Sequence, residues 1–105
     1  MENIMVITKR VGQKCTVEEI ENSLRSLQQI VGGYIEILRM DFNPALILIC
    51  NEEGKLLNLE PTLDLGYDVI CGNYLIAKDD GFGELISLNA VDIADIQKYL
   101  NIKLD

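Results

Sequence analysis

The sequence predicts an α+β fold: a mainly antiparallel sheet of four to seven strands, with one helix near the N-terminus and one at the C-terminus packed on it. Three observations predict it. β-rich runs recur between turn residues, a stretch with helical spacing precedes Gly32-Gly33, and a second such stretch follows Asn89. The chain is 49% apolar over 105 residues, and no linker or low-complexity segment divides it. We therefore expect residues 1–105 to form a single compact domain.

The first third of the chain predicts a strand, a basic loop and a helix. Residues 3–8 are β-rich, and residues 9–14 form a basic, turn-like connection. Thr16 and Glu19 have the spacing of a capping box, in which both side chains satisfy free N–H groups at a helix start. The apolar residues of 17–30 recur at spacings of three and four, so we expect a helix there with one stripe on the sheet.

The middle third predicts the centre of the sheet. Gly32-Gly33 can end the helix, because glycine takes positive φ without a Cβ penalty. Residues 34–40 alternate as a strand with both faces at least half covered. Residues 45–50 are apolar throughout, so we expect a strand buried on both faces and place it at the centre of the sheet. The polar loop at 51–54 then predicts a hairpin with residues 55–59.

The last third predicts short strands and a final helix. Residues 60–66 contain proline and have no clean period, which indicates a loop with at most one helical turn. Residues 67–71 and 73–78 are β-rich on either side of a glycine, as two strands or as one strand with a bulge. After a turn, residues 84–88 form another short strand. An asparagine then caps a helix over residues 90–100.

Charge and composition restrict the partners. Seventeen acidic against nine basic side chains give a net charge of −8, which repels phosphate backbones, so we expect no binding to a nucleic acid polymer. A small anion stays possible, since a local cluster of basic or backbone N–H groups can hold a phosphate. The start lacks a secretory signal, and no apolar stretch approaches the roughly twenty residues that span a bilayer. We therefore expect no membrane association and a cytoplasmic location, where the three cysteines stay reduced.

The available chemistry predicts binding without catalysis. Histidine is absent, which removes the commonest general base, the Ser/His and Cys/His nucleophile systems and most zinc sites. No cysteine has a CxxC partner, and Cys50 and Cys71 lie in apolar runs that predict core positions. We expect no metal, no cofactor and no enzymatic activity. An enzyme that uses Glu36 or an aspartate with Tyr34 as acid and base is kept as a minor alternative.

The candidate binding residues cluster first at Gly32-Gly33-Tyr34. Adjacent glycines can expose backbone N–H groups, and the tyrosine ring could stack on a base or pack on a sugar. A helix C-cap followed by a strand aromatic is the structural alternative. Further polar candidates lie in or beside the predicted sheet, where each is equally suited to a solvated strand face. They are Lys55, Asn58, Thr62, Asn73 and Lys78. Glu36 and Tyr74 are also candidates, and Glu36 could instead pair with Arg39 as surface ions.

Three sequence blocks carry a family resemblance. VGGYIE at 31–36, NEEGKL at 51–56 and ICGNYLI at 70–76 resemble, in order and spacing, the family catalogued as domain of unknown function 3846. The resemblance covers about Leu27 to Leu88. Family members are typically encoded by bacteriophages, plasmids and other mobile elements, so the resemblance implies a bacterial cytoplasm and an accessory role, and it implies no enzyme. Many members carry an asparagine shortly after the proline that matches Pro61, whereas Thr62 follows here.

Together these observations lead to one functional expectation and one alternative. We expect a non-catalytic protein of a phage or mobile element that binds a small anionic or nucleotide-like ligand, for example by sequestering a nucleotide-derived immune signal of the host. Because one 105-residue domain buries a ligand poorly, we expect a homo-oligomer with pockets near subunit interfaces. The alternative is an acidic protein-binding module that inhibits a host or element-encoded protein.

Overall fold

The structure, a computed structural model that describes residues 2–105, has eight strands and two helices over that range. The strands are β1 (Asn3–Lys9), β2 (Thr16–Glu21), β3 (Ile35–Met40), β4 (Asn43–Asn51), β5 (Pro61–Asp64), β6 (Val69–Cys71), β7 (Tyr74–Asp79) and β8 (Leu85–Ile86). The helices are α1 (Leu24–Val31) and α2 (Ala90–Leu100). The predicted α+β class, with an early and a late helix, is confirmed.

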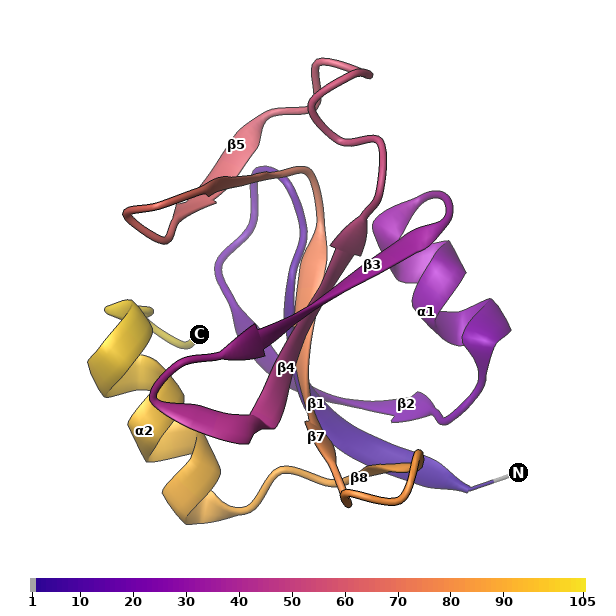
Figure 1. The fold of residues 1–105 in the computed structure, drawn as a ribbon, viewed down its shortest axis with the longest axis vertical. Coiled ribbons are helices and arrows are strands. Elements are labelled where there is room, and N and C mark those ends of the chain that lie inside the picture. The colour runs from indigo at the N-terminus through magenta and orange to yellow at the C-terminus, as the bar shows by residue number, and fades with distance from the viewer. Residues whose placement is uncertain (1) are drawn as a thin grey trace.

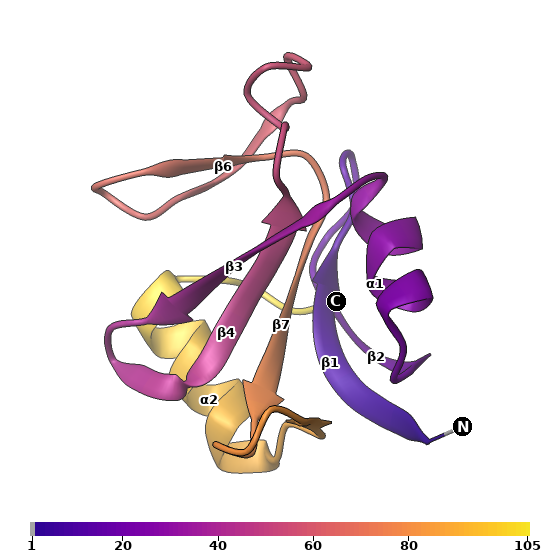
Figure 2. The same ribbon diagram turned by 45° about the vertical axis from the view of Figure 1, so that its right-hand side comes forward.

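Six strands form the main sheet, and every pairing within it is antiparallel. The order is β2-β1-β7-β4-β3, and β8 pairs with β7. Strands β5 and β6 pair with each other as a separate arm that projects beyond the sheet (Figure 1). The two helices lie on opposite sides of the sheet, as Figure 2 also shows.

The core has two layers because the inner strands are apolar on both faces. In β4, Leu46 and Leu48 belong to the cluster under α2, whereas Ile47 and Ile49 belong to the cluster under α1. Strand β7 alternates in the same way, and Tyr74–Ala77 are all buried. The predicted burial of residues 45–50 is therefore confirmed. Their predicted central place is wrong, since β7 occupies the middle of the sheet and β4 lies beside it.

The predicted helix over residues 17–30 is wrong in its first half. Residues Thr16–Glu21 form β2, which pairs with β1 and places Ile20 opposite Ile4. β-branched side chains favour a strand where an apolar partner strand is present, and that partner overrides the helical spacing. The helix starts later, where Ser23 Oγ accepts a hydrogen bond from Ser26 N at 3.1 Å. The predicted end is confirmed, because Gly32 is the C-cap with φ of 80°.

The predicted hairpin between residues 45–50 and 55–59 is also wrong. Both edges of β4 are already occupied, by β3 on one side and β7 on the other, so residues 55–59 have no strand to pair with. Residues 52–58 instead form consecutive turns, in which Leu57 N donates to Glu53 O at 2.9 Å. The loop predicted at 60–66 contains β5, whose Pro61 lies opposite Cys71 in the arm. Proline is tolerated there because β5 is an edge strand.

The remaining elements agree with the sequence in type. The β-rich runs around Gly72 are two strands, β6 and β7, and Gly72 takes φ of 90° between them. Asn89 caps α2 in a reciprocal capping box with Asp92. In α2, Ile96 is fully buried, whereas Tyr99 is 56% exposed. No helix within residues 2–105 is long and apolar enough to cross a membrane.

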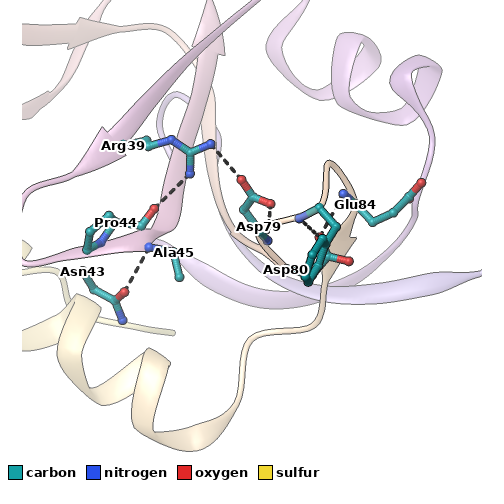
Figure 3. Close-up of polar contacts among 9 residues, drawn as sticks. Arg39, Asn43, Pro44, Ala45, Asp79, Asp80 and Glu84 are labelled. Atoms are coloured by element: carbon teal, nitrogen blue, oxygen red, sulfur yellow. Dashed lines mark hydrogen bonds and ion pairs between the residues drawn. The ribbon is translucent and has the colours of Figure 1, made fainter.

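Strand β3 is an edge strand, and Arg39 ties it to the sheet. Its guanidinium reaches across β4, where Nη2 donates to Asp79 Oδ2 at 2.8 Å and Nη1 donates to the Pro44 carbonyl at 3.0 Å (Figure 3). The Asp79 carboxylate also accepts from Gly81 N at 2.8 Å, which fixes the turn after β7. The expectation that both faces of this strand are at least half covered is wrong, because Ile37 is 52% exposed.

Candidate functional site

A cleft lies where helix α1 ends and strand β3 begins. Its first part is a hollow of about 280 Å³, lined by Gln28, Gly32, Gly33, Tyr34, Asn51, Glu53 and Leu57. A second hollow of about 190 Å³ shares Gly32, Asn51 and Leu57 with the first and extends to Val11 and Asn73. Because three residues line both hollows, we treat them together as one feature, the helix-end cleft.

Two asparagines build the floor of the helix-end cleft. The last carbonyls of an α-helix lack partners within the helix. Asn51 Nδ2 donates to the Val31 carbonyl at 3.2 Å, and Asn73 Nδ2 donates to the Ile30 carbonyl at 2.9 Å. Each amide oxygen accepts a backbone N–H in turn, at 2.7 Å from Glu53 N to Asn51 and at 2.7 Å from Val11 N to Asn73. The two side chains therefore hold the helix, the turn after β4 and the β1–β2 loop together.

The glycines of the cleft have roles in backbone conformation and packing. The N–H groups of Gly32 and Gly33 both donate to the Gln28 carbonyl, at 2.8 and 3.2 Å, so these two donors are used inside the turn. A Cβ on Gly33 would lie 3.0 Å from Asn51 Nδ2, and glycine therefore lets the chain pass close to that amide. This geometry favours the C-cap interpretation of Gly32-Gly33 over the idea of exposed N–H groups.

Tyr34 lies on the rim of the cleft. Its side chain is 68% exposed, while its carbonyl accepts a hydrogen bond from Glu52 N at 2.9 Å. The backbone of this residue is thus fixed, and the ring is open to solvent beside the hollow. Leu57, which is 57% exposed, contributes a second apolar surface to the same hollow. The cleft therefore combines a rigid polar floor with an apolar rim.

Glu36 and Lys55 belong to a different hollow, of about 150 Å³, which Asp68, Cys50 and Cys71 also line. The Lys55 ammonium donates to the Asp68 carboxylate. This hydrogen bond is the main cause that raises the pKa of Lys55 and lowers the pKa of Asp68. The structure therefore does not bring Glu36 and Lys55 together with Tyr34 in one cleft.

Thr62 and Tyr74 have structural roles. Thr62 Oγ1 donates to the Gly72 carbonyl at 2.7 Å, which holds the start of β5 against the end of β6. Tyr74 is 1% exposed, and its hydroxyl lies 3.5 Å from Cys15 Sγ. Burial is the main cause that raises the pKa of the Tyr74 phenol, with the Cys15 contact second, so the group stays neutral. Tyr74 is a core residue with no surface for a ligand, in contrast to the prediction from its sequence position.

Comparison with known families gives one match. Residues 1–101 match the family described as domain of unknown function (DUF3846). The chain belongs to this family. The match extends the resemblance, which rested on residues 27–88, to β1, β2 and the start of α1. No curated protein and no solved structure matches the chain.

Each block that carries the DUF3846 resemblance contributes to the helix-end cleft. The block at 31–36 supplies the glycines and Tyr34, the block at 51–56 supplies Asn51 and Glu53, and the block at 70–76 supplies Asn73. Five residues that line the cleft were not among the predicted site residues, namely Val11, Gln28, Asn51, Glu53 and Leu57. One signal in the sequence pointed to Asn51. A polar side chain at the end of a buried apolar strand needs hydrogen-bond partners, and neighbouring segments of the chain can supply them. Val11 and Leu57 had no such signal.

The thiols of this DUF3846 member do not form an activated nucleophile at the cleft. Cys50 is 4% exposed, which confirms its predicted core position. Burial, followed by the charge of Glu36, raises the pKa of the Cys50 thiol to about 11, so it is protonated near neutral pH. Cys71 is only half-buried, so its predicted core position is not met in full. Within residues 2–105, no group of three or more histidine, cysteine or acidic side chains is placed to hold a metal ion.

Proposed function

We propose that the protein binds a small nucleotide-like molecule in the helix-end cleft and leaves it chemically unchanged. One observation carries the proposal: the exposed ring of Tyr34 and the exposed side chain of Leu57 line the same hollow. A planar base can stack on an aromatic ring, and such contacts contribute about 1–3 kcal/mol per base. An apolar side chain beside the ring gives the base a further contact surface.

The polar lining of this hollow fits the sugar or the base edge. Gln28 and Glu53 both line it, and neither side chain makes a hydrogen bond within the part of the chain that the structure describes. A carboxylate accepts hydrogen bonds from ribose hydroxyls or from base N–H groups. It repels a phosphate, so we place any anionic group of the ligand away from Glu53.

The other end of the cleft lies beside a basic loop. Val11 lines that end, and it belongs to the loop at residues 9–14, which holds three of the nine basic side chains, Lys9, Arg10 and Lys14. Arg10 pairs with Glu18 at 3.0 Å, and none of the three basic side chains lines the cleft itself, so the loop attracts an anionic group at longer range. A local basic cluster can attract an anion against an unfavourable net charge, because salt screens the more distant acidic groups. The proposed ligand therefore spans the cleft, with its ring at Tyr34 and its anionic group toward this loop.

The side chains that line the cleft support retention without turnover. They include no thiol and no lysine, and the chain has no histidine, so the carboxylate of Glu53 and the phenol of Tyr34 are the lining groups that could move a proton. Typical small-molecule pockets measure roughly 300–1,000 Å³ and enclose most of the ligand. The cleft is open, so we further propose that a second copy of the chain covers the bound molecule. Sequestration of a nucleotide-derived host signal in a bacterial cytoplasm is the role that best fits the implied mobile-element setting.

The experiment is isothermal titration of the protein with cyclic nucleotides and ADP-ribose derivatives. Tyr34→Leu removes the ring and keeps an apolar side chain, and Phe82→Leu is the matched control, because Phe82 is 92% exposed and lies outside the cleft. We expect one member of the panel to bind, with a Kd raised about tenfold by Tyr34→Leu and unchanged by Phe82→Leu, which corresponds to about 1.4 kcal/mol. Absence of binding by every member would contradict the proposal.

A second function, inhibition of a protein partner, is favoured by one observation. Leu56 is 80% exposed at the turn after β4, directly beside the exposed Leu57. Adjacent exposed leucines on an acidic protein can form an apolar contact with a partner protein, with charged residues around that contact. The association rate of such a complex falls as the salt concentration rises. Pull-down from host lysate at two ionic strengths, with wild type and Leu56→Ser, tests this function. Leu56 does not line the helix-end cleft, so nucleotide binding should survive that substitution.

A further inference from the structure

A further hollow, separate from those described above, lies on the opposite side of the sheet from α1. It measures about 180 Å³ and is lined by Met40, Asp41, Phe42, Leu65, Tyr67, Tyr99 and Leu100. These residues come from three places, namely the β3–β4 turn, the tip of the β5–β6 arm and the C-terminal end of α2. All three places lie together on the left in Figures 1 and 2, far from the helix-end cleft. We call this feature the aromatic hollow.

The aromatic hollow gathers three of the six aromatic side chains of the protein. Phe42 and Tyr99 stack with ring centroids 4.7 Å apart and planes 12° from parallel. Tyr67 is 67% exposed and Tyr99 is 56% exposed, although both line the same concave surface. Three aromatic rings, two of them stacked on each other, therefore surround a space that the proposed nucleotide site does not use.

The charges at the aromatic hollow favour a positively charged ligand. The ammonium of Lys98 lies 5.3 Å from the Tyr99 ring centroid. Tyr99 therefore already accepts a cation, and a ligand cation at this ring would displace the exposed Lys98 side chain, whereas the Tyr67 ring is open to a ligand. The charged side chain in the lining is Asp41, and no basic side chain lines the hollow. A net charge of −8 adds a long-range attraction for cations.

We propose that the aromatic hollow binds an organic cation, an ammonium group that carries methyl or other small alkyl substituents. Aromatic rings attract such a cation through their quadrupoles, by about 0.5–2 kcal/mol according to how far it is desolvated. The carboxylate of Asp41 adds direct charge attraction. Met40, Leu65 and Leu100 provide apolar contacts for the alkyl substituents. The carboxylate of Asp41 repels an anion, and a neutral molecule keeps only the apolar contacts.

The test compares choline with 3,3-dimethyl-1-butanol, which has the same shape but carries a carbon in place of the charged nitrogen. NMR titration of the full chain follows the aromatic signals of Phe42, Tyr67 and Tyr99. We expect saturable shifts with choline and roughly tenfold weaker binding of the neutral analogue, the upper part of the range that cation–π contacts support. Asp41→Asn and Tyr67→Leu should each weaken choline binding about fivefold without unfolding the chain, since both residues are exposed.

The control variant is Tyr34→Leu, which lies in the helix-end cleft and should leave choline binding unchanged. This control separates the two sites, so failure here and failure of the nucleotide proposal are distinguishable. Equal affinity for choline and its neutral analogue would overturn the proposal and leave an apolar pocket only. Absence of saturable shifts with choline, in a chain whose circular dichroism shows it to be folded, would overturn it as well.

Discussion

Asn51 and Asn73 lie side by side at the ends of β4 and β7, and their amide groups bind the last two carbonyls of helix α1. The helix is short, with eight residues, and it ends on these two side chains as well as on its Gly32 cap. The same two amides line the helix-end cleft. Attachment of the helix and the shape of the cleft therefore depend on one pair of residues.

Asn51→Asp tests this relationship with little change in volume. The substitution keeps the oxygen that accepts from Glu53 N, but it removes the N–H donor to the Val31 carbonyl and adds a negative charge at a helix C-terminus. We expect the free energy of unfolding to fall by about 1–3 kcal/mol, as measured by urea denaturation. Gln13→Glu adds the same charge in an exposed loop and is the control. Equal stability of the two variants would contradict the assigned role.

Gly54→Ala tests a close backbone approach. A Cβ on Gly54 would lie 2.5 Å from the Cys71 carbonyl oxygen, and that atom belongs to the backbone of β6 and cannot move alone. We expect a loss of about 1–3 kcal/mol in the free energy of unfolding, typical of overpacking.

The matched comparison is Gly66→Ala. Gly66 has φ of 90° and open space around the added methyl group, so only its conformation opposes alanine. Conformational strain of this kind costs about 1 kcal/mol. Thermal denaturation of both variants measures the difference. A Gly54→Ala protein as stable as wild type would show that the two segments are not packed as closely as described.

The Arg39–Asp79 pair predicts a pH dependence. The hydrogen bond from Arg39, followed by that from Gly81 N, lowers the pKa of Asp79 below its ordinary value of 3.8. A carboxyl whose pKa is lower in the folded state contributes stability that is complete above its unfolded pKa and is lost as pH falls through the folded pKa. We expect Arg39→Gln to be less stable than wild type at neutral pH, with the difference closing as pH falls through the lowered pKa of folded Asp79.

NMR titration of the Asp79 carboxyl checks the cause directly. Its pKa should be higher in Arg39→Gln than in wild type, because the variant loses the charged donor that is the main cause of the lowered pKa. An unchanged pKa of Asp79 in the variant would show that the ion pair does not form in solution. Because both groups meet solvent, added salt should weaken the effect.

The three cysteines should differ in reactivity. Cys71 is half-buried, whereas Cys50 and Cys15 are buried. A pKa of about 11 for Cys50, against an ordinary value of 9.0, leaves roughly a hundredfold less thiolate at mildly alkaline pH. We expect iodoacetamide to modify Cys71 first, as followed by mass spectrometry of peptides at increasing times. Faster modification of Cys50 would contradict its described burial.

The sequence predicted the fold where the signals are local. The Asn89 cap, the Gly32 end of α1 and the apolar run in β4 each depend on neighbouring residues, and all three are observed. Two errors have a common physical cause. Residues 16–21 are a strand because β1 lies beside them, and residues 55–59 are not a strand because β3 and β7 already occupy β4. The sequence of a segment does not show which strands will lie beside it in the fold.

The candidate site was predictable only in part, for the same reason. Gly32, Gly33 and Tyr34 are consecutive, and the structure places all three at the cleft together with Asn73. Residues that reach the cleft from distant segments, such as Val11 and Leu57, carry no local sign of that position. Alternation alone could not show that Tyr74 faces the core, because β7 is covered on both sides.

The most direct test of the central claim is NMR shift mapping of the tightest ligand from the nucleotide panel, followed by mass analysis of the recovered ligand. The account predicts shifts centred on Tyr34, Glu53 and Leu57, with a ligand of unchanged mass after prolonged incubation. Shifts centred on the hollow of Glu36 and Lys55, or a ligand converted to a product, would contradict it.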